Sequence, residues 1–482
     1  ISACLVGSEM CIRDSKAPGP DGIPSHACSL LANDIGPFIT AFYQHSIKLG
    51  SIPDEWRIAN VVPIHKGGDK QDAANYRPVS LTSIFCKVLE HIICSSIMKH
   101  LDSLHLLFRD QHGFRKGLSC ETQLLLLVED LTRSLDNGKQ VDLVFLDFSK
   151  AFDTVPHLRL LRKLDAYKLD PLIIKWIESF LSDRSQRVII NGVISDSVPV
   201  ISGVPQGSVL GPLLFLIYIN DLPSSIRSSI RLFADDTVIY KEIDSSEDCD
   251  ALQESLHSIE EWCDLWQLKL NAKKCSVMRV TKRRHVIQKC YNIGGTTLGV
   301  VNQYKYLGVF LSEDLSWNAH VHYIAGKALK NLRFVQRTLK RCPQNVRQIA
   351  YNTLVLPVLQ YCSSVWDPHQ VGLTSHIQMV QRKAARFVLD RYGRMDSVSE
   401  MLQHLNWKPL VDGRRDSRLR RFEQIISGHS SFTCADVLKP ANYVGRNDRV
   451  NKVREVRCRT DSYFWSFFPR TIRDWNREEI KL

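Results

Sequence analysis

Two adjacent aspartates are placed where they could hold metal ions. Asp235 and Asp236 interrupt an apolar stretch, with Leu232 before them and Val238-Ile239-Tyr240 after, so they are predicted at the bend of a hairpin. Neighbouring carboxylates repel each other unless a cation lies between them. Magnesium takes hard oxygen ligands, and two such ions about 4 Å apart assist in-line displacement at phosphorus. The pair therefore predicts a site for phosphoryl-transfer chemistry.

A third carboxylate is needed to bridge two ions, and Asp147 suits that position. Five of the six residues from Val141 to Leu146 are apolar, which predicts a short strand covered on both faces, and Asp147 directly follows it. That strand has to lie beside the hairpin for the three carboxylates to meet. Taken singly, Asp147 could instead cap a helix, and Asp235-Asp236 could merely form a turn.

Strands and helices alternate from residue 16 to about residue 310. Val188 to Ile194 encloses Asn191-Gly192 between apolar runs, which predicts a hairpin because these residues accept positive φ. Ser246 to Trp266 predicts an amphipathic helix, and Val79 to His100 predicts another after a turn at Asn75 to Pro78. Two more helices are expected: one after Pro156, with a buried stripe of Leu158, Leu161 and Leu164, and one from Pro212 to Asn220.

Composition indicates a folded protein with a polyanionic partner or an acidic membrane surface. At 482 residues, roughly three domains of about 150 residues are expected. The net charge is +12, and no apolar run approaches the roughly 18 residues that span a bilayer. The 14 cysteines include no Cys-x-x-Cys pair, which argues against a zinc knuckle or a disulfide framework. We interpret them as reduced thiols of an intracellular protein.

The second half of the chain is helical in pattern and rich in positive charge. Ala319 to Lys340 carries one apolar face and, on another face, a stripe of five cations: Lys327, Lys330, Arg333, Arg337 and Lys340. The stripe could follow nucleic-acid phosphates or could be an ordinary solvated face. From Met401 onward there are 17 basic and 10 acidic residues, so this region holds +7 of the total charge.

The first residues differ in character from the rest. Residues 1–15 begin without Met and lack the basic start and apolar stretch of a signal peptide. We expect them to be a foreign leader and leave them out of the fold.

Six motifs occur in one order along the chain. They are Lys16-Ala17-Pro18-Gly19-Pro20-Asp21-Gly22-Ile23-Pro24, Asn75-Tyr76-Arg77-Pro78-Val79-Ser80-Leu81, Gln111-His112-Gly113-Phe114-Arg115-Lys116-Gly117, Leu146-Asp147-Phe148-Ser149-Lys150-Ala151-Phe152-Asp153, Gly203-Val204-Pro205-Gln206-Gly207-Ser208 and Phe233-Ala234-Asp235-Asp236. The ordered set resembles the reverse transcriptases of jockey-like non-LTR retrotransposons, over nearly the whole chain from Ser15. It implies an α/β right-hand polymerase fold: fingers and palm over 16–310, a helical thumb over 311–400 and a helical, basic C-terminal region over 401–482.

The resemblance also implies the metal ligands and the selectivity residue. Asp147 and Asp235 are expected to bind two Mg²⁺ ions, with Mn²⁺ as an alternative, and Asp236 completes the acidic triad. Phe152 matches the steric gate whose ring would collide with a ribose 2′-hydroxyl. An ordinary core aromatic is the alternative for Phe152.

Further residues match positions that contact the nucleotide. Lys66 and Arg77 resemble the finger residues that neutralise the triphosphate, for which an ammonium and a guanidinium are suited. Gln206 and Gly207 match the loop against the incoming nucleotide and template, or form a simple turn. Lys274 matches the lysine that protonates pyrophosphate, or is a surface lysine.

Two further segments resemble parts of the family outside the nucleotide site. Tyr306, Leu307 and Gly308 resemble the primer grip, and in that context phosphate contact becomes the favoured role for the cationic stripe. Tyr463 to Arg470 also looks familial, with an apolar docking segment as the alternative, and is given no catalytic role.

The predicted reaction is RNA-templated addition of deoxynucleotides to a primer 3′-hydroxyl. Expected partners are template RNA, primer DNA and deoxynucleoside triphosphates, with no membrane, and the family's action on chromosomal DNA implies access to the nucleus from the cytoplasm. An endonuclease, which complete elements carry upstream, is not expected in this chain. Two rival functions are an inactive fragment that only binds nucleic acid and an RNA-templated RNA polymerase, against which Phe152 counts.

Overall fold

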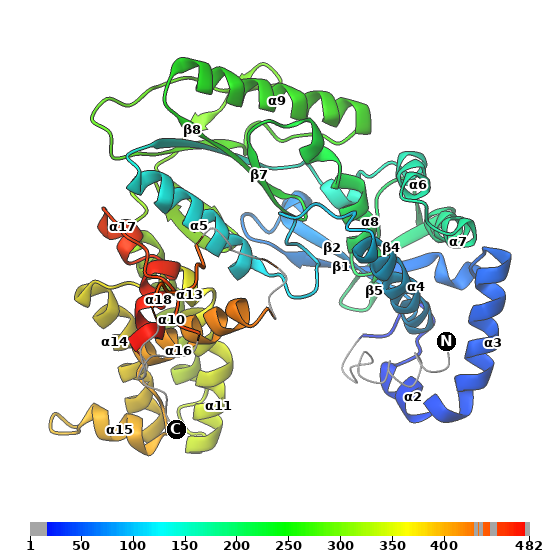
Figure 1. The fold of residues 1–482 in the computed structure, drawn as a ribbon. Helices are drawn as coiled ribbons and strands as arrows, with labels where there is room; N and C mark the ends of the chain where they lie inside the picture. Colours follow the sequence, from blue (N-terminus) through cyan, green and yellow to red (C-terminus); the bar gives the residue numbers. More distant parts are fainter. Residues whose placement is uncertain (1–16, 429–431, 433–436, 444–450, 478–482) are drawn as a thin grey trace.

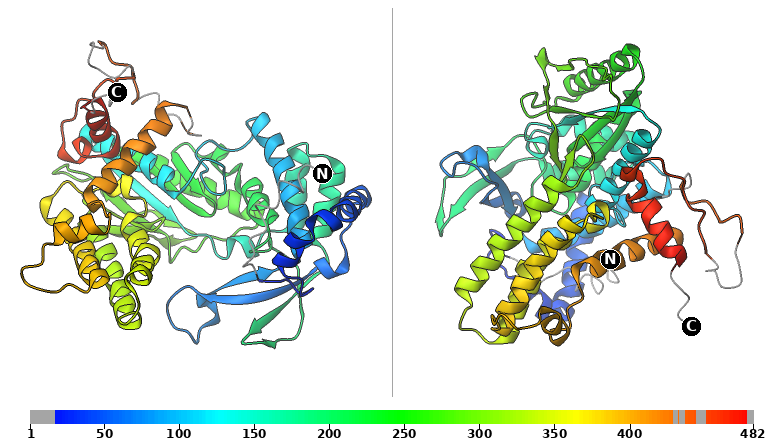
Figure 2. Two further views of the ribbon diagram at one scale, coloured as in Figure 1. Left: turned by 90° about the horizontal axis from the view of Figure 1, so that it is seen from below. Right: turned by 90° about the vertical axis from the view of Figure 1, so that its left-hand side faces the viewer.

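The computed structural model describes residues 17–428, 432, 437–443 and 451–477. The predicted leader over 1–15 lies outside these ranges, as does part of the predicted C-terminal region. Within the described ranges the chain is mixed α/β, as predicted: two five-stranded sheets and their helices come first, and a mainly helical assembly follows (Figure 1). Figure 2 shows this helical assembly at the opposite end of the molecule from the N-terminal helices.

One of the two five-stranded sheets, called the central sheet here, has a strand with no exposed residue in its middle. In spatial order its strands are β12 (Gly299–Val300), β9 (Ser276–Val280), β3 (Gln140–Leu146), β8 (Asp236–Ile243) and β7 (Ser229–Phe233). Successive side chains of a strand point to opposite faces, and along β3 Phe145 enters one hydrophobic core while Val144 enters the other. The predicted strand with two covered faces is confirmed.

Helices cover both faces of the central sheet. On one side lies α5 (Cys120–Asp136), and on the other lie α8 (Leu210–Ile219) and α9 (Ser246–Trp266). Every residue of α8 except Pro212 is buried, which explains its uninterrupted apolar sequence. The predicted bounds of α9 are confirmed. A small ribbon of β10 (Asn292–Ile293) and β11 (Thr296–Thr297) packs beside α9.

The other five-stranded sheet, called the N-terminal sheet here, corrects one prediction. It contains β2 (Tyr76–Leu81), β1 (Ile58–His65), β4 (Arg184–Ile190), β5 (Val193–Ile194) and β6 (Val198–Val200). Tyr76 to Pro78 is strand, not turn, and the following helix begins at Ile84 rather than Val79. Because β2 is an edge strand, it tolerates Pro78. The hairpin is confirmed, with φ of +50° at Asn191 and +84° at Gly192.

Five more helices are described in this part of the chain, and most of them share the hydrophobic core of α8 and α9. They are α2 (Ser25–Leu30), α3 (Ala32–Leu49), α4 (Ile84–Ser103), α6 (His157–Ala166) and α7 (Pro171–Leu181). The helix after Pro156 is confirmed, but its buried stripe was wrong in one position, because Leu158 is 76% exposed. Leu164 is buried as predicted and Leu161 is half-buried, while Leu160, four residues before Leu164 on the same face, is buried in place of Leu158.

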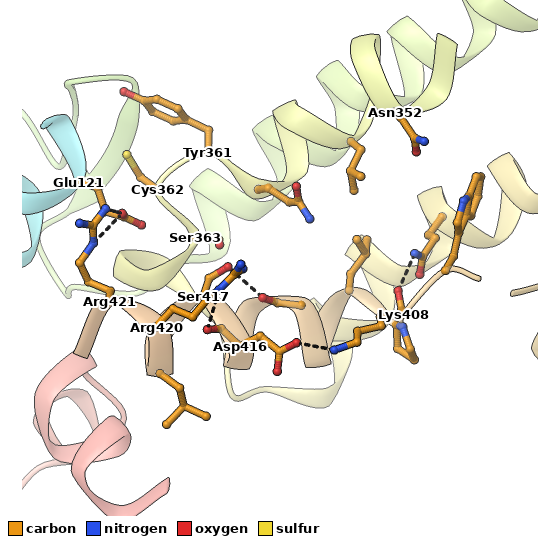
Figure 3. A pocket seen from close by; sticks show the side chains of 18 of the residues that line it. Glu121, Asn352, Tyr361, Cys362, Ser363, Lys408, Asp416, Ser417, Arg420 and Arg421 are labelled. Carbon is orange, nitrogen blue, oxygen red and sulfur yellow. Dashed lines mark hydrogen bonds and ion pairs between the residues drawn. The ribbon is translucent and has the colours of Figure 1, made fainter. Parts of the chain in front are cut away.

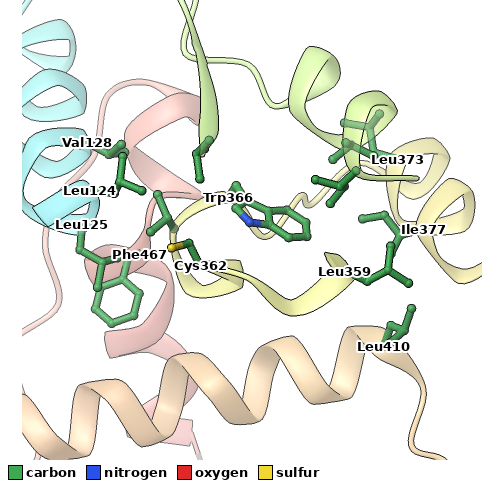
Figure 4. Close-up of a cluster of buried hydrophobic side chains, with 14 of the residues drawn as sticks. Leu124, Leu125, Val128, Leu359, Cys362, Trp366, Leu373, Ile377, Leu410 and Phe467 are labelled. Carbon is green, nitrogen blue, oxygen red and sulfur yellow. The ribbon is translucent and has the colours of Figure 1, made fainter. Parts of the chain in front are cut away.

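The helical assembly follows a hairpin of β13 (Gln303–Tyr306) and β14 (Val309–Ser312). Its helices are α10 (Asn318–Thr338), α11 (Gln344–Leu354), α12 (Leu356–Gln360), α13 (Ser363–Trp366), α14 (Val371–Leu389), α15 (Val398–His404) and α16 (Leu410–Ile426). Trp366 lies at the centre of their shared core (Figure 4). Among the described residues, no helix is long and apolar enough to cross a bilayer.

The end of the described chain returns to the central sheet. α17 (Asp461–Phe464) and α18 (Phe467–Arg477) pack against α5, and the Tyr463 hydroxyl donates to Glu129 at 2.9 Å. Phe467 and Phe468 are buried in the same core as α5. This packing agrees with the docking interpretation of the aromatic segment.

Candidate active site

The predicted carboxylates gather at one end of the central sheet. β3 and β8 are antiparallel with Leu146 opposite Thr237, so the next residue, Asp147, lies level with Asp236. Asp235 precedes Asp236 in the turn between β7 and β8. The register therefore brings together residues that are far apart in the sequence.

The electrostatics of these carboxylates show that they interact. Burial raises the pKa of Asp235, and Asp147 raises it further, whereas Arg77 and Lys66 lower it. Asp236 is exposed, but partial desolvation by its surroundings, then Asp235 and Asp147, raise its pKa to about 6. Carboxylates that lie close together resist ionisation, and a bound cation lowers their pKa values by balancing their charge.

The fit to magnesium rests on the chemistry of the donors. The described residues contain no group of three or more His, Cys, Asp or Glu side chains close enough to form a ready metal cluster. Carboxylate oxygens are nevertheless the ligands that Mg²⁺ and Mn²⁺ prefer, and magnesium commonly takes only one or two of them alongside substrate phosphates. The rise that Asp147 causes in the pKa of Asp235 and of Asp236 is consistent with such a site.

Lys274 lies beside the carboxylates because its loop is hydrogen-bonded to the chain at the end of β3. The Asn271 N–H donates to the Asp147 carbonyl at 2.8 Å, and the Ser149 N–H donates to the Lys269 carbonyl at 2.7 Å. The Lys274 Nζ lies 3.8 Å from the Asp147 Oδ2, and its side chain is 69% exposed. It is thus a solvent-facing cation beside the carboxylates.

The segment after β3 that carries Phe152 is hydrogen-bonded to the loop that carries Gln206. The Phe152 ring stacks on Phe215, with centroids 4.3 Å apart, and the Val204 N–H donates to the Phe152 carbonyl at 2.7 Å. The Gln206 Nε2 donates to the Asp153 Oδ1 at 2.7 Å. The loop around residue 205 is therefore fastened to the segment that carries Phe152.

Gly207 joins this loop to the N-terminal sheet. The Ser80 N–H donates to the Gln206 carbonyl at 2.7 Å. Gly207 has φ of +113°, and a Cβ there would lie 2.5 Å from the Ser80 carbonyl oxygen. Only glycine permits this approach of two backbones.

Lys66 and Arg77 project from the N-terminal sheet. Arg77 lies on β2 opposite Ile64, and Lys66 follows β1 directly, with its N–H donating to Asn75. Both side chains are exposed. Their effect on the pKa of Asp235 places them within electrostatic range of the carboxylates.

The β13–β14 hairpin reaches the same region from the other side. Tyr306 is buried, while Leu307 and Gly308 form the tip, with φ of +46° and +84°. The Tyr361 hydroxyl donates to the Leu307 carbonyl at 2.9 Å. Burial raises the pKa of Tyr304 to about 12, and Asp236 and Asp147 add to the rise, which places this hairpin near the carboxylates.

Two residues of the site received no role from the sequence. Gln111 is bonded to the turn that carries Asp235, and Phe114 is 57% exposed, with its ring centroid 6.3 Å from that of Phe152 in a T-shaped arrangement. Both belong to the third motif of the ordered set. That motif was the available signal, but a motif without partners does not say what its side chains contact.

A separate pocket of about 1240 Å³ opens between the start of α5, the α11–α13 segment and α16 (Figure 3). It does not include the carboxylates. Two cations on its wall are already paired: the Arg421 Nη2 lies 2.6 Å from the Glu121 Oε2, and the Lys408 Nζ lies 2.9 Å from the Asp416 Oδ2. We assign no ligand to this pocket.

Comparison with known proteins agrees with this geometry. The family model described as reverse transcriptase (RNA-dependent DNA polymerase) matches residues 64–311, a span that contains every predicted site residue. Among relatives, the chain is 30% identical over 394 residues to the "Probable RNA-directed DNA polymerase from transposon X-element" of Drosophila melanogaster, with 79% of this chain and 43% of the relative covered.

Two further relatives extend the comparison. The "RNA-directed DNA polymerase from mobile element jockey" of Drosophila melanogaster is 28% identical, with 77% of this chain and 42% of the relative covered. The "Retrovirus-related Pol polyprotein from type-1 retrotransposable element R1" of Bradysia coprophila is 26% identical, with 73% and 35% covered. The chain thus spans less than half the length of these relatives. It belongs to the reverse transcriptase (RNA-dependent DNA polymerase) family, together with the polymerases of jockey-like non-LTR retrotransposons.

Proposed function

We propose that this chain is an RNA-directed DNA polymerase of a non-LTR retrotransposon, which adds deoxynucleotides to a primer 3′-hydroxyl on an RNA template. The observation that carries the proposal is the convergence of Asp147, Asp235 and Asp236 at the end of the central sheet, within the span matched by the family. These carboxylates would hold Mg²⁺ or Mn²⁺, and the bound ions would supply activation of the 3′-hydroxyl and stabilisation of the leaving oxygen.

The side chains around the carboxylates would bind and orient the substrate. Lys66 and Arg77 neutralise the triphosphate from the N-terminal sheet, with Arg77 suited to bidentate contact. Lys274, beside Asp147, donates a proton to the departing pyrophosphate. The Phe152 ring limits the space beside the sugar of the incoming nucleotide. The loop of Gln206 and Gly207 lies against the new base pair.

The proposal extends to the arrangement of domains. Residues 16–310 correspond to fingers and palm, with the N-terminal sheet in the fingers and the central sheet in the palm. Residues 311–400 form the thumb, and residues 401–482 the basic C-terminal region. The Leu307-Gly308 tip serves as primer grip through its backbone, since Tyr306 is buried. Because retrotransposons of this family insert into chromosomal DNA, we place the protein in the cytoplasm and nucleus.

The cationic stripe, which lies on α10 except for Lys340 just after its end, supplies positive charge for the template–primer duplex. All five cations of the stripe (Lys327, Lys330, Arg333, Arg337 and Lys340) are exposed. Phosphate contacts of this kind release counterions, so binding should weaken steeply with added salt.

One primer-extension experiment tests the function. The protein is given a primed RNA template, Mg²⁺ and either deoxynucleotides or ribonucleotides, and the products are resolved by length. Extension with deoxynucleotides alone is expected. Template binding without extension would leave only the nucleic-acid-binding function, and extension with ribonucleotides alone would indicate an RNA-templated RNA polymerase.

Phe152→Ala should admit ribonucleotides. Removing the ring opens space at the 2′ position, so the preference for deoxynucleotides is expected to fall by about tenfold or more, an effect worth about 1.4 kcal/mol. The ratio of kcat/KM for the two nucleotide classes measures it. Phe180→Ala, which removes a buried ring stacked on Trp176, is the control for loss of packing. Unchanged selectivity in Phe152→Ala would remove Phe152 from the gate.

Gly207→Ala should impair the loop that backs the base pair. The new Cβ meets the Ser80 carbonyl oxygen, so the loop has to move, and a shift of about 1 Å at a reacting centre costs up to about 100-fold in rate. Gly192→Ala is the matched control, since Gly192 also has positive φ but has no atom within 4 Å of a new Cβ. Equal extension rates in the two variants would contradict the prediction.

A further inference from the structure

The turn that carries Asp235 contains a residue in an uncommon backbone conformation. Phe233 pairs with Asp236, so Ala234 and Asp235 alone form the turn between β7 and β8. Ala234 has φ of +55°. Residues with a Cβ rarely adopt this left-handed conformation unless the surrounding structure holds them in it.

One side chain bonds both backbone groups of Ala234. The Gln111 Oε1 accepts from the Ala234 N–H at 2.8 Å, and the Gln111 Nε2 lies 3.4 Å from the Ala234 carbonyl oxygen, to which it donates. The same Oε1 accepts from the Gly113 N–H at 2.8 Å. Gln111 is only 1% exposed, so water does not compete for these bonds.

The segment that carries Gln111 is itself anchored. The His112 N–H donates to the Leu232 carbonyl at 2.9 Å, and the Leu232 N–H donates to the Asp110 carbonyl at 3.0 Å. The His112 Nδ1 lies 2.9 Å from the Thr122 Oγ1 in the first turn of α5. A Cβ on Gly113 would lie 2.4 Å from the Ala234 nitrogen, so the two backbones touch.

We propose that Gln111 is a positioning residue for Asp235: its amide holds Ala234 in the left-handed conformation and thereby directs the next side chain into the site. This inference rests on the proposed function, since it concerns a carboxylate of that site. Among the described residues, the hydrogen bonds of the Gln111 side chain go to the backbone of Ala234 and Gly113. Its effect reaches Asp235 through the backbone of the turn alone.

Hydrogen exchange tests the hold on the turn without any need for activity. In Gln111→Met, a substitution of similar size, the Ala234 amide loses its acceptor and should exchange about tenfold faster, as expected for loss of one net hydrogen bond. Gln140→Met is the matched control, because Gln140 is also buried and bridges the Ile287 backbone through both ends of its amide. Unchanged exchange at Ala234, or equal acceleration there in Gln140→Met, overturns the inference.

Primer extension then tests the consequence for the site. Gln111→Met is expected to lower kcat about tenfold and to raise the half-saturating Mg²⁺ concentration severalfold, since a misplaced ligand weakens the site while nucleotide contacts stay intact. The KM for deoxynucleotides should stay within about twofold. Normal kcat and Mg²⁺ dependence in Gln111→Met overturns the inference. An inactive unmodified chain would instead refute the proposed function, and the exchange result would still decide whether Gln111 holds the turn.

Discussion

Asp235→Asn is expected to lower the rate of primer extension by about 10³-fold. A carboxylate that binds the catalytic ions contributes several kcal/mol of charge stabilisation, and about 4 kcal/mol corresponds to this factor. Asparagine keeps the shape of the side chain, so the loss reports the charge. The measurement is single-nucleotide addition to a primed RNA at saturating deoxynucleotide, with Mg²⁺ varied.

The same variant should not lose stability, which separates a metal ligand from a structural aspartate. Burial and Asp147 raise the pKa of Asp235, so at a pH above that pKa its charge disfavours the folded state. Asn removes this cost. With a chelator present at neutral pH, the free energy of unfolding of Asp235→Asn is therefore expected to equal or exceed that of the unmodified protein.

Asp244→Asn is the matched control, just beyond the other end of β8. Asp244 is bound by Lys139 and by the Arg283 Nη2 at 2.6 Å, and hydrogen bonds from these two cations lower its pKa. Its loss should leave the extension rate within about twofold and cost at most about 1 kcal/mol of stability. A comparable loss of rate in both variants would mean that Asp235 acts through the fold and not through metal.

Local sequence patterns correctly predicted the elements that depend only on residues close together in the chain. The α9 bounds and the Asn191-Gly192 hairpin follow from apolar spacing and from turn residues that accept positive φ. The prediction failed at Tyr76 to Pro78, because proline there marks an edge strand, and the edge is a property of the whole sheet. It also failed at Leu158, where helical spacing alone did not show which face is buried.

The hairpin that carries Asp235 and Asp236 and the buried strand before Asp147 were predicted correctly, but the contacts around them were not. Motif order identified Asp147 and Asp235, but only the register of β3 and β8 shows that they meet. The anchors of the site could not be read from local sequence, because the Gln111 bond to Ala234 joins segments 123 residues apart. Long-range contacts of this kind depend on the folded arrangement of the two segments.

The contacts of the charged residues in the C-terminal region could not be predicted from the sequence either. Counting residues predicted a basic region, but it did not show where the charges point. On α16, Arg414 and Arg418 face inward and bind the buried Asp367, while Arg421 binds Glu121 at the start of α5. Part of the positive charge therefore stabilises the fold and is not available to nucleic acid.

Asp367→Ala is expected to cost about 3–5 kcal/mol of stability, as removal of one partner from a buried ion network does. The Asp367 side chain is 2% exposed and lies 2.6 Å from the Arg414 Nε, 3.0 Å from the Arg418 Nε and 3.3 Å from the Arg470 Nη1. Within the described residues, the Arg414 Nη1 and Nη2 are buried without another hydrogen-bond partner. Removing the Asp367 carboxylate takes away the ion-pair partner of the buried Arg414, whereas Arg418 keeps Asp474 and Arg470 keeps the backbone carbonyl of residue 367. Urea unfolding measures the loss.

Asp416→Ala, on the helix α16 that carries Arg414 and Arg418, is the control. Its carboxylate lies 2.9 Å from the Lys408 Nζ, but the two side chains are 42% and 74% exposed, so its loss should cost less than about 1 kcal/mol. Because Asp367 ties α16 and α18 to α13, its removal should also loosen the contacts of the C-terminal region with α5, seen as faster hydrogen exchange at Arg459 and Thr460, whose N–H groups donate to Asp136. Equal stability losses in the two variants would show that burial of the network is not what makes Asp367 important.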